Sequence, residues 1–195
     1  LRHPNVVPVH DAGVHEGMKY FTMEFIEGPS LKEELEKYRR EGKPMLLMVG
    51  VNYVLQAAKG LAHVHSMGIV HRDVKPGNIL IDPVSKSAMI TDFGLAKEME
   101  EESSLSQEGV AVGTPDYMAP EQAAGKKDEV GPWSDVFSLG VVLYEVITDT
   151  MPFRGETSGE RVADKVGGAD PIPFENALKQ KARQGWRREK IPRDL

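Results

Sequence analysis

The segment from Ser134 to Thr148 constrains the fold most, because it is apolar almost all the way round. A helix on the surface of a protein carries its apolar residues on one stripe, whereas a helix that is apolar on every side must be enclosed. Its most apolar run, 136–147, contains Glu145 and is much shorter than the roughly 20 residues that cross a bilayer. We therefore predict a helix in the middle of a helical domain, with no membrane segment.

Two further helices are predicted in the first third of the chain. Apolar residues over 51–65 recur with the i, i+3, i+4, i+7 spacing of an amphipathic helix, and Gly68 is suited to end it. A shorter helix is predicted from Ser30 to about residue 40. Its first residues have the S-x-x-E spacing of a capping box, in which Ser30 and Glu33 bond to each other's free amides.

A β-hairpin is predicted at the start of the chain. The β-branched run 6–9 and the segment 20–26 both have high β propensity, and Asp11-Ala12-Gly13 is typical of a turn. We expect the two segments to pair antiparallel, with the turn at these three residues.

The remaining segments give weaker signals. Residues 69–95 are typical of short strands and loops, and the polar stretch 97–112 indicates a mobile loop. A short helix is expected near 158–166. The basic tail, 179–193, is interpreted as a solvated helix or loop.

The composition is that of an ordinary soluble protein, with 195 residues, 40% of them hydrophobic and 28% charged. This balance excludes a disordered chain and a collagen-like fibre, and the length suits one domain or slightly more. The chain has no cysteine, which excludes disulfides, a thiolate zinc site and a cysteine nucleophile, and indicates the cytoplasm. The net charge of -6 argues against nucleic acid or an anionic membrane as a partner.

Three residues of one short segment have the side chains that phosphoryl transfer needs. An aspartate such as Asp73 accepts the proton of an attacking hydroxyl, and a lysine such as Lys75 neutralises charge on the moving phosphoryl group. Asn78 offers a hard oxygen to Mg²⁺. Pro76 and Gly77 favour a compact loop in which the three side chains converge.

A second acidic motif, Asp92-Phe93-Gly94, follows 19 residues after Asp73. A carboxylate at the end of a strand, followed by glycine, is well placed to hold a metal ion. The tripeptide alone is a weak signal. Its position after the first motif is the order in which phosphoryl transfer would need the two motifs.

The chain resembles the eukaryotic-type serine/threonine protein kinases. The segment 71–78 is similar to their H-R-D-x-K-x-x-N catalytic loop, and 92–94 to their magnesium-binding motif. The segment 113–121 is similar to the end of an activation segment, and 135–140 to the buried helix that follows it. The opening, 1–5, resembles the approach to the fourth strand of the small lobe.

Individual residues in these motifs indicate which class of protein kinases the chain resembles. Lys75, together with Gly113-Thr114 ahead of Ala119-Pro120-Glu121, resembles serine/threonine rather than tyrosine kinases. The segments 74–78 and 115–118 resemble those of bacterial members.

This resemblance implies ATP and Mg²⁺ as cofactors and a serine or threonine hydroxyl of a protein as the phosphate acceptor. It implies that Asp73 is the catalytic base, that Lys75 contacts the γ-phosphate, and that Asn78 and Asp92 hold magnesium. The adenosine would lie among five residues: Met23 as gatekeeper, the backbones of Glu24 and Ile26, Leu80 beneath the ring and Ser30 near the ribose. For Ser30, the role of helix N-cap is an equally good interpretation.

The resemblance also implies regulatory and structural roles. Arg72 can pair with a phosphate on the activation loop, where the candidates are Ser103, Ser104, Ser106 and Thr114. The serines are favoured because Thr114 has a competing contact with the catalytic loop, and plain linker serines are an open alternative. Among the structural residues, His71 and Phe93 would stack with Val9. Asp135 would anchor the backbone of the catalytic loop, and Glu121 would be half of an ion pair.

The expected fold is α+β and kinase-like, mostly the helical large lobe. We expect residues 1–26 to be a remnant of the small lobe and hinge, and 27–195 a large lobe that is incomplete at its end. The Gly-rich loop, the strand lysine and the helix glutamate of the family have no counterpart in this sequence. Taken alone, the chain is therefore expected to bind ATP poorly and to have little activity.

Two alternative functions stay open. A small-molecule kinase also uses an aspartate-to-asparagine loop and a metal-binding aspartate, although the segment 113–121 resembles a platform for peptides. A pseudokinase-like interaction module would bind partners without transfer. The intact Asp73, Lys75, Asn78 and Asp92 argue against that reading.

Overall fold

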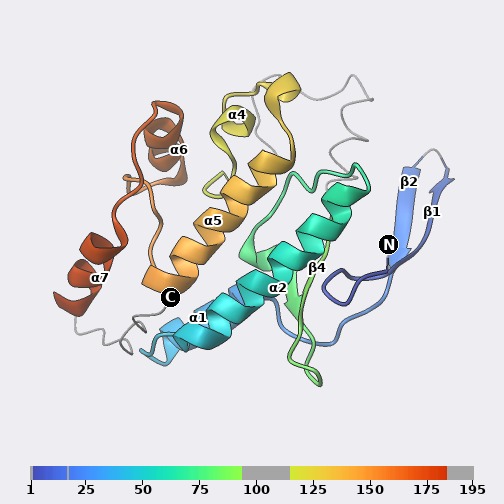
Figure 1. Ribbon diagram of the computed structural model, residues 1–195, viewed down its shortest axis with the longest axis horizontal. Coiled ribbons are helices and arrows are strands. Elements are labelled where there is room, and N and C mark those ends of the chain that lie inside the picture. Colours follow the sequence, from blue (N-terminus) through green and yellow to red (C-terminus); the bar gives the residue numbers. More distant parts are fainter. Residues whose placement is uncertain (1, 17, 94–114, 184–195) are drawn as a thin grey trace.

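Two long helices form the centre of the computed structural model, which describes residues 2–16, 18–93 and 115–183. Helix α2 (Leu47–Ser66) and helix α5 (Pro132–Thr148) pack side by side (Figure 1). Their facing sides supply much of the hydrophobic core, including Val54, Leu61 and Val142. The predicted helical domain is thus confirmed.

Helix α5 departs from the prediction at its first turn. It begins two residues earlier than predicted, at Pro132, because proline is well suited to the first helical position. Ser134, Asp135 and Ser138 are buried, yet Trp133 and Val136 are 62% and 63% exposed. The helix is therefore enclosed along most of its length but not on every side.

The two other early helices form for local reasons. Helix α1 (Leu31–Arg40) begins at the predicted capping box, in which the amide of Glu33 donates to Ser30 Oγ and Ser30 N donates to the Glu33 carboxylate. Helix α2 starts four residues earlier than predicted. It ends at Ser66, and Gly68 takes the left-handed conformation with φ of 77°.

The hairpin exists, but its predicted position is wrong. Strand β1 (Val9–His15) pairs antiparallel with strand β2 (Met18–Met23), so the presumed turn residues 11–13 lie inside β1. A side chain at Gly13 would collide with the Tyr20 ring opposite, so this glycine gives space to a cross-strand neighbour. The chain turns instead after β1, where Glu16 has φ of 50°.

A second small sheet lies against α2. Strand β3 (Ile79–Ile81) follows the 3₁₀ turn η1 (Pro76–Asn78) and pairs antiparallel with strand β4 (Ala88–Ile90). Val6 and Val7, which we predicted in the hairpin, are buried beside β4. The amide of Val7 donates to Ile90 O at 2.9 Å. Their side chains are therefore buried, and their backbone lies beside β4 instead of pairing with β2.

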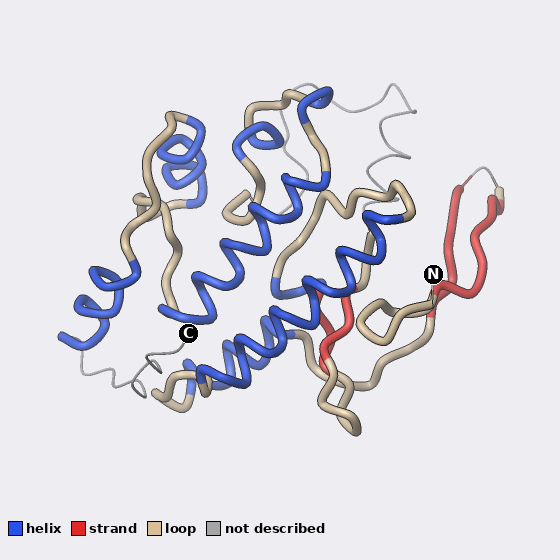
Figure 2. Tube along the Cα trace, in the orientation of Figure 1, coloured by secondary structure: helices blue, strands red, loops and turns tan. Residues whose placement is uncertain are grey.

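Short helices flank α5 on the side away from the hairpin, as Figures 1 and 2 show. They are α6 (Ser158–Val166), at the predicted place, and α7 (Phe174–Arg183). The chain between 115 and 131 contributes α4 (Pro120–Ala123) and the 3₁₀ turn η2 (Lys127–Glu129). The predicted loop 97–112 lies outside the described residues. Within the described ranges, no helix has the length and apolar character needed to cross a membrane.

Candidate active site

The loop that precedes η1 is attached to helix α5 through Asp135. This carboxylate is 1% exposed and accepts the amide hydrogens of His71, at 2.7 Å, and Arg72, at 2.8 Å. His65 on α2 contacts the same carboxylate at 2.7 Å. The two central helices thereby fix the backbone of the loop, at a point where Arg72 takes a left-handed φ of 63°.

His71 connects this loop to the end of strand β4. Its Nδ1 accepts the amide hydrogen of Asp73 at 3.3 Å, and its Nε2 lies 2.9 Å from the carbonyl of Thr91. A neutral ring with its proton on Nε2 satisfies both contacts. Burial lowers the pKa of His71 despite the nearby charge of Asp135, which agrees with that neutral form. The ring also contacts Phe93, with centroids 5.2 Å apart.

The side chains of Lys75 and Asn78 both bond to one carboxylate oxygen of Asp73, in a loop that is compact as predicted. Lys75 Nζ donates to Asp73 Oδ2 at 2.6 Å, and Asn78 Nδ2 donates to the same oxygen at 3.1 Å. Asn78 Nδ2 also donates to the Asp73 carbonyl at 2.9 Å. Asn78 is buried whereas the other two side chains are a fifth to a quarter exposed. The loop therefore presents a lysine and a carboxylate towards solvent on a rigid base.

The register of the second sheet places Asp92 beside this loop. Ile79 pairs with Ile90, so Asn78 before β3 meets Thr91 after β4, and the amide of Thr91 donates to Asn78 O at 3.0 Å. Asp92 follows at once, exposed and with a left-handed φ of 56°. Backbone conformations of this kind occur often at functional sites.

The donor set of Asn78 and Asp92 fits a magnesium ion. Mg²⁺ prefers hard oxygen ligands and keeps several waters, so one amide oxygen and one carboxylate are a suitable protein contribution. The hydrogen bonds of the Asn78 side chain to Asp73 both use Nδ2, so Oδ1 is the atom that could bind the ion. Among the described residues there is no cluster of three or more His, Cys, Asp or Glu side chains that would suit another metal.

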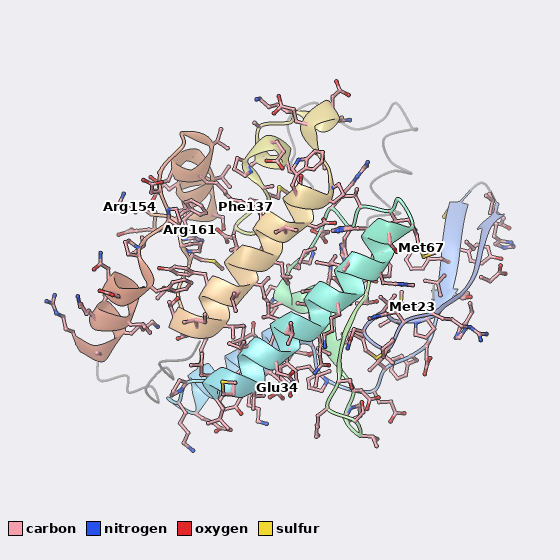
Figure 3. The ribbon with its side chains drawn as sticks, viewed as in Figure 1. Met23, Glu34, Met67, Phe137, Arg154 and Arg161 are labelled. Atoms are coloured by element: carbon pink, nitrogen blue, oxygen red, sulfur yellow. The ribbon has the colours of Figure 1, made fainter. Side chains whose placement is uncertain are left out.

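The residues predicted around adenosine belong to both sheets and to the segment after β2, and Ser30 in that segment pairs with Leu80 of β3. Met23, labelled in Figure 3, ends β2. Its sulfur accepts a hydrogen bond from Thr91 Oγ1 at 3.3 Å. The amide of Glu24 donates to Pro8 O, so its carbonyl is the backbone group that could bind a base. Leu80 and Ile26 are half-buried. The roles assigned to these residues remain predictions.

Ser30 is the N-cap of α1. Its hydroxyl donates to Glu33 Oε2 at 2.9 Å and accepts from the Glu33 amide. Both hydrogen-bonding functions of the hydroxyl are thus used within the capping box, which supports the N-cap interpretation. The same contacts hold the carboxylate charged, because the backbone and side-chain hydrogen bonds from Ser30 lower the pKa of Glu33.

The end of the activation-type segment contacts the loop through Gln122. Gln122 Nε2 donates to Arg72 O at 2.9 Å. The neighbouring Glu121, expected as half of an ion pair, accepts a short hydrogen bond from Ser134 Oγ on α5. Several predicted residues lie outside the described ones: Gly94, Ser103, Ser104, Ser106 and Thr114.

Two contributors to the site were not foreseen from the sequence. The sequence assigned no role in the site to His65 or to Gln122. His65 lies on the buried stripe of its helix, where a polar residue requires a partner, and that signal points to the Asp135 carboxylate. No sequence pattern pointed to Gln122.

The loop of Asp73, Lys75 and Asn78, the adjacent Asp92 and the helical scaffold have the arrangement that the resemblance to protein kinases implies. The sequence matches the family described as "Protein kinase domain" over residues 1–186. Since this match covers nearly the whole chain, the chain belongs to the protein kinase family.

Similar proteins carry serine/threonine kinase names. Serine/threonine-protein kinase PknB of Mycobacterium leprae is 38% identical over 177 residues, which is 89% of this chain and 27% of that protein. PknH of Mycobacterium bovis is 37% identical over 92% of this chain and 28% of its own length. A probable PknB of Lactococcus lactis is 35% identical over 81% and 24%. The chain thus spans about a quarter of these relatives.

Proposed function

We propose that the protein transfers the γ-phosphate of ATP to serine or threonine hydroxyls of proteins. The observation that carries this proposal is the convergence of Lys75 and Asn78 on Asp73 Oδ2, with Asp92 brought alongside by the β3–β4 register. The names of the relatives support serine/threonine specificity. In this proposal residues 1–26 belong to the small lobe and hinge, and residues 27–195 belong to the large lobe.

The side chains act mainly by position and charge. Asp73 orients the attacking hydroxyl and accepts its proton, while Lys75, already 2.6 Å from that carboxylate, neutralises charge on the transferred group. Asn78 Oδ1 and Asp92 would hold Mg²⁺. When bound, this ion neutralises charge on the ATP phosphates. The neutral His71 keeps the two acidic segments at a fixed separation through Asp73 N and Thr91 O.

The recognition of the nucleotide is the less complete part of the site. The carbonyl of Glu24, the backbone of Ile26 and the side chains of Met23 and Leu80 are the groups we assign to the adenine. Ser30 is assigned to the N-cap and not to the ribose, because its hydroxyl is engaged with Glu33.

Substitution of Asp73 by Asn tests the proposal. The full-length protein is incubated with Mg²⁺, labelled ATP and a mixture of serine- and threonine-containing peptides. We expect transfer by the wild type and a loss of at least about 100-fold in Asp73→Asn, in the range that general-base catalysis contributes. The exposed Asp128, changed to Asn, is the matched control and should retain activity.

Other results would contradict the proposal in distinct ways. Transfer to a sugar or an aminoglycoside, with none to peptides, would indicate a small-molecule kinase. Partner binding without ATP or transfer would indicate an interaction module. Equal peptide transfer by the wild type and Asp73→Asn would overturn the role of this carboxylate.

A further inference from the structure

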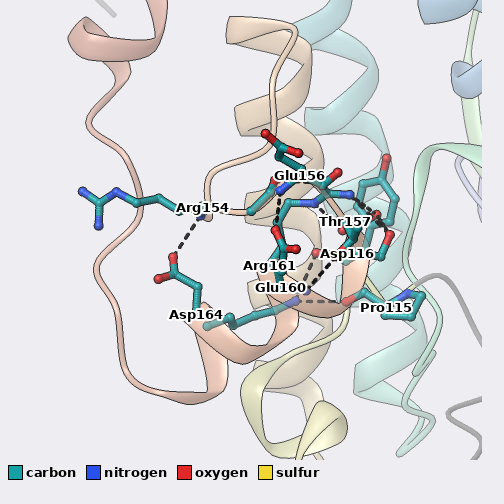
Figure 4. A network of polar contacts seen from close by, with 12 residues as sticks. Pro115, Asp116, Arg154, Glu156, Thr157, Glu160, Arg161 and Asp164 are labelled. Carbon is teal, nitrogen blue, oxygen red and sulfur yellow. Dashed lines mark hydrogen bonds and ion pairs between the residues drawn. The ribbon is translucent and has the colours of Figure 1, made fainter.

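One face of helix α6 is directed at the segment that precedes α4. Ser158, Arg161 and Lys165 recur with the spacing of one helical face. Ser158 Oγ donates to Asp116 Oδ2 at 2.7 Å, and Arg161 donates to both oxygens of the same carboxylate, at 2.7 and 3.2 Å (Figure 4). Arg161 also binds the carbonyls of Gly155 and Glu156, so it joins the α5–α6 connection to the segment 115–118.

Lys165 makes the deepest contact of this face. The residue is 2% exposed, and its ammonium lies 5.8 Å from the Phe137 ring centroid and 5.6 Å from that of Phe153. These two rings stack with centroids 6.0 Å apart. Figure 3 labels Phe137 on α5 and Arg161 on α6, which point into the region between the two helices. A lysine is seldom this buried without partners for its charge.

The partners are three backbone carbonyls of one short segment. Lys165 Nζ donates to Pro115 O at 3.1 Å, to Asp116 O at 3.1 Å and to Met118 O at 2.7 Å. An ammonium group has three N–H donors, so every donor is used. The segment lies outside the regular helices and strands. Its carbonyls are therefore fixed by a side chain instead of by a helix or a sheet.

The charge of Lys165 is consistent with this role. Burial lowers its pKa to about 8, the carboxylate of Asp116 opposes that shift and the charge of Arg161 adds to it. The side chain is thus still mainly protonated at neutral pH. In that form it can supply all three hydrogen bonds.

The fixed segment is also connected to the candidate active site. Beyond Met118 the chain enters α4, where Gln122 donates to Arg72 O, next to Asp73. The catalytic loop itself is held separately by Asp135. A change at Lys165 should therefore alter the segment 115–118 while leaving the loop that carries Asp73 in place.

We propose that Lys165 is a positioning residue for the protein substrate: its ammonium holds the backbone of 115–118, which belongs to the segment that resembles a platform for peptides. This inference rests on the proposed kinase function. It predicts that Lys165 affects the binding of the peptide and not the binding of ATP. A residue needed only for folding would affect both.

The test compares Lys165→Met and Lys165→Arg with wild type in the full-length protein. Methionine keeps an apolar stem between the two phenylalanine rings but removes all three donors, whereas arginine keeps the charge and part of the hydrogen bonding. The exposed Lys179 on α7, changed to Met, is the matched control. The measurements are the KM for peptide, the KM for ATP and amide hydrogen exchange across 115–118.

We expect Lys165→Met to raise the peptide KM by about tenfold, the factor for the loss of one net hydrogen bond. The ATP KM should stay within about twofold, the level of an unaffected site. The Met118 amide, which donates to Pro115 O, should exchange faster in this variant, and Lys165→Arg should recover part of both effects. The control should match the wild type.

Four outcomes would overturn the inference or its basis. A peptide KM unchanged in Lys165→Met, or equal rises in both KM values, would show that Lys165 does not position the peptide. Unchanged hydrogen exchange at 115–118 would show that it does not hold the segment. A wild type that phosphorylates no peptide would refute the kinase proposal instead, and the hydrogen exchange would then decide alone whether Lys165 fixes this backbone.

Discussion

Replacing Asp135 by Asn is the most direct test of how the candidate catalytic loop is held. The carboxylate is almost fully buried and accepts from His71 N, Arg72 N and His65 Nε2, at 2.7, 2.8 and 2.7 Å. Asparagine has the same size and shape. It keeps one oxygen as an acceptor but presents an NH₂ group where the second oxygen was.

The expected cost follows from which oxygen each donor uses. His71 and His65 share Oδ2, whereas Arg72 uses Oδ1, so the less costly orientation of Asn places its oxygen at the Oδ2 position. The Arg72 bond is then lost, at about 1.5–3 kcal/mol for a bond to a charged acceptor, and the other two become weaker neutral bonds. We expect a total loss of about 3 kcal/mol, a large share of the 5–15 kcal/mol that stabilises a typical domain.

Urea unfolding followed by circular dichroism measures this loss. With an m-value of about 2 kcal/mol per M, the midpoint of Asp135→Asn should fall by about 1.5 M. The control is Asp128→Asn, on the exposed turn η2, which should unfold like the wild type. A midpoint for Asp135→Asn within about 0.3 M of the control would refute the reasoning, since it corresponds to less than one such hydrogen bond.

Three further changes test other parts of the structure. Ser30→Ala should lower the free energy of unfolding by about 1 kcal/mol, the usual cost of losing an N-cap, as read from thermal or urea unfolding. Gly28→Ala should destabilise by about 2–3 kcal/mol because the new methyl group meets the Ile81 carbonyl, whereas Gly140→Ala, in open space on α5, should stabilise by about 0.5–1 kcal/mol. Burial would raise the pKa of Asp116, but bonds from Arg161 and Ser158 outweigh it and lower the pKa. The stability that the Asp116 carboxylate contributes is therefore present above the unfolded pKa of about 3.9 and is lost as the pH falls below that value. In urea unfolding, the advantage of the wild type over Asp116→Asn should shrink from pH 5 to pH 3.

The helices were predictable because their signals are local. The capping box at Ser30, the apolar stripe of 51–65 and the small residue at Gly68 each act within a few residues of the chain. Boundaries were less well predicted. Both long helices begin earlier than predicted, α5 at Pro132 and α2 at Leu47, and the first residue of α2 is itself buried.

The strands were harder to predict because their partners decide them. The residues 11–13 have the composition of a turn, yet cross-strand pairing with Tyr20 and its neighbours places them in a strand. Val6 and Val7 have the composition of a hairpin strand, yet they bond beside Ile90, more than eighty positions further along the chain. Sequence propensity cannot distinguish these partners.

In the candidate site, too, contacts between residues close in sequence were predictable from the residues themselves, whereas contacts between distant residues were not. The contacts of Lys75 and Asn78 with Asp73 lie within a span of six residues, and the spacing together with Pro76 and Gly77 predicted a compact loop there. The contact of Lys165 with 115–118 joins residues about fifty positions apart, and no short motif records it. Asp135, which acts on the loop from α5, was predicted because a family motif contains it, whereas Lys165 belongs to no such motif.

The attachment of the loop to α5 has a consequence for biosynthesis. Arg72 and Asp135 are separated by 63 residues, and ribosomes add about 5–20 residues per second. The loop is therefore made roughly 3–13 s before the carboxylate that holds its amides. During that interval the nascent chain already contains Asp73 and Asp92, but its loop amides bond only to water or to transient partners. The geometry of the site is established late in translation, when α5 leaves the ribosome and docks against α2.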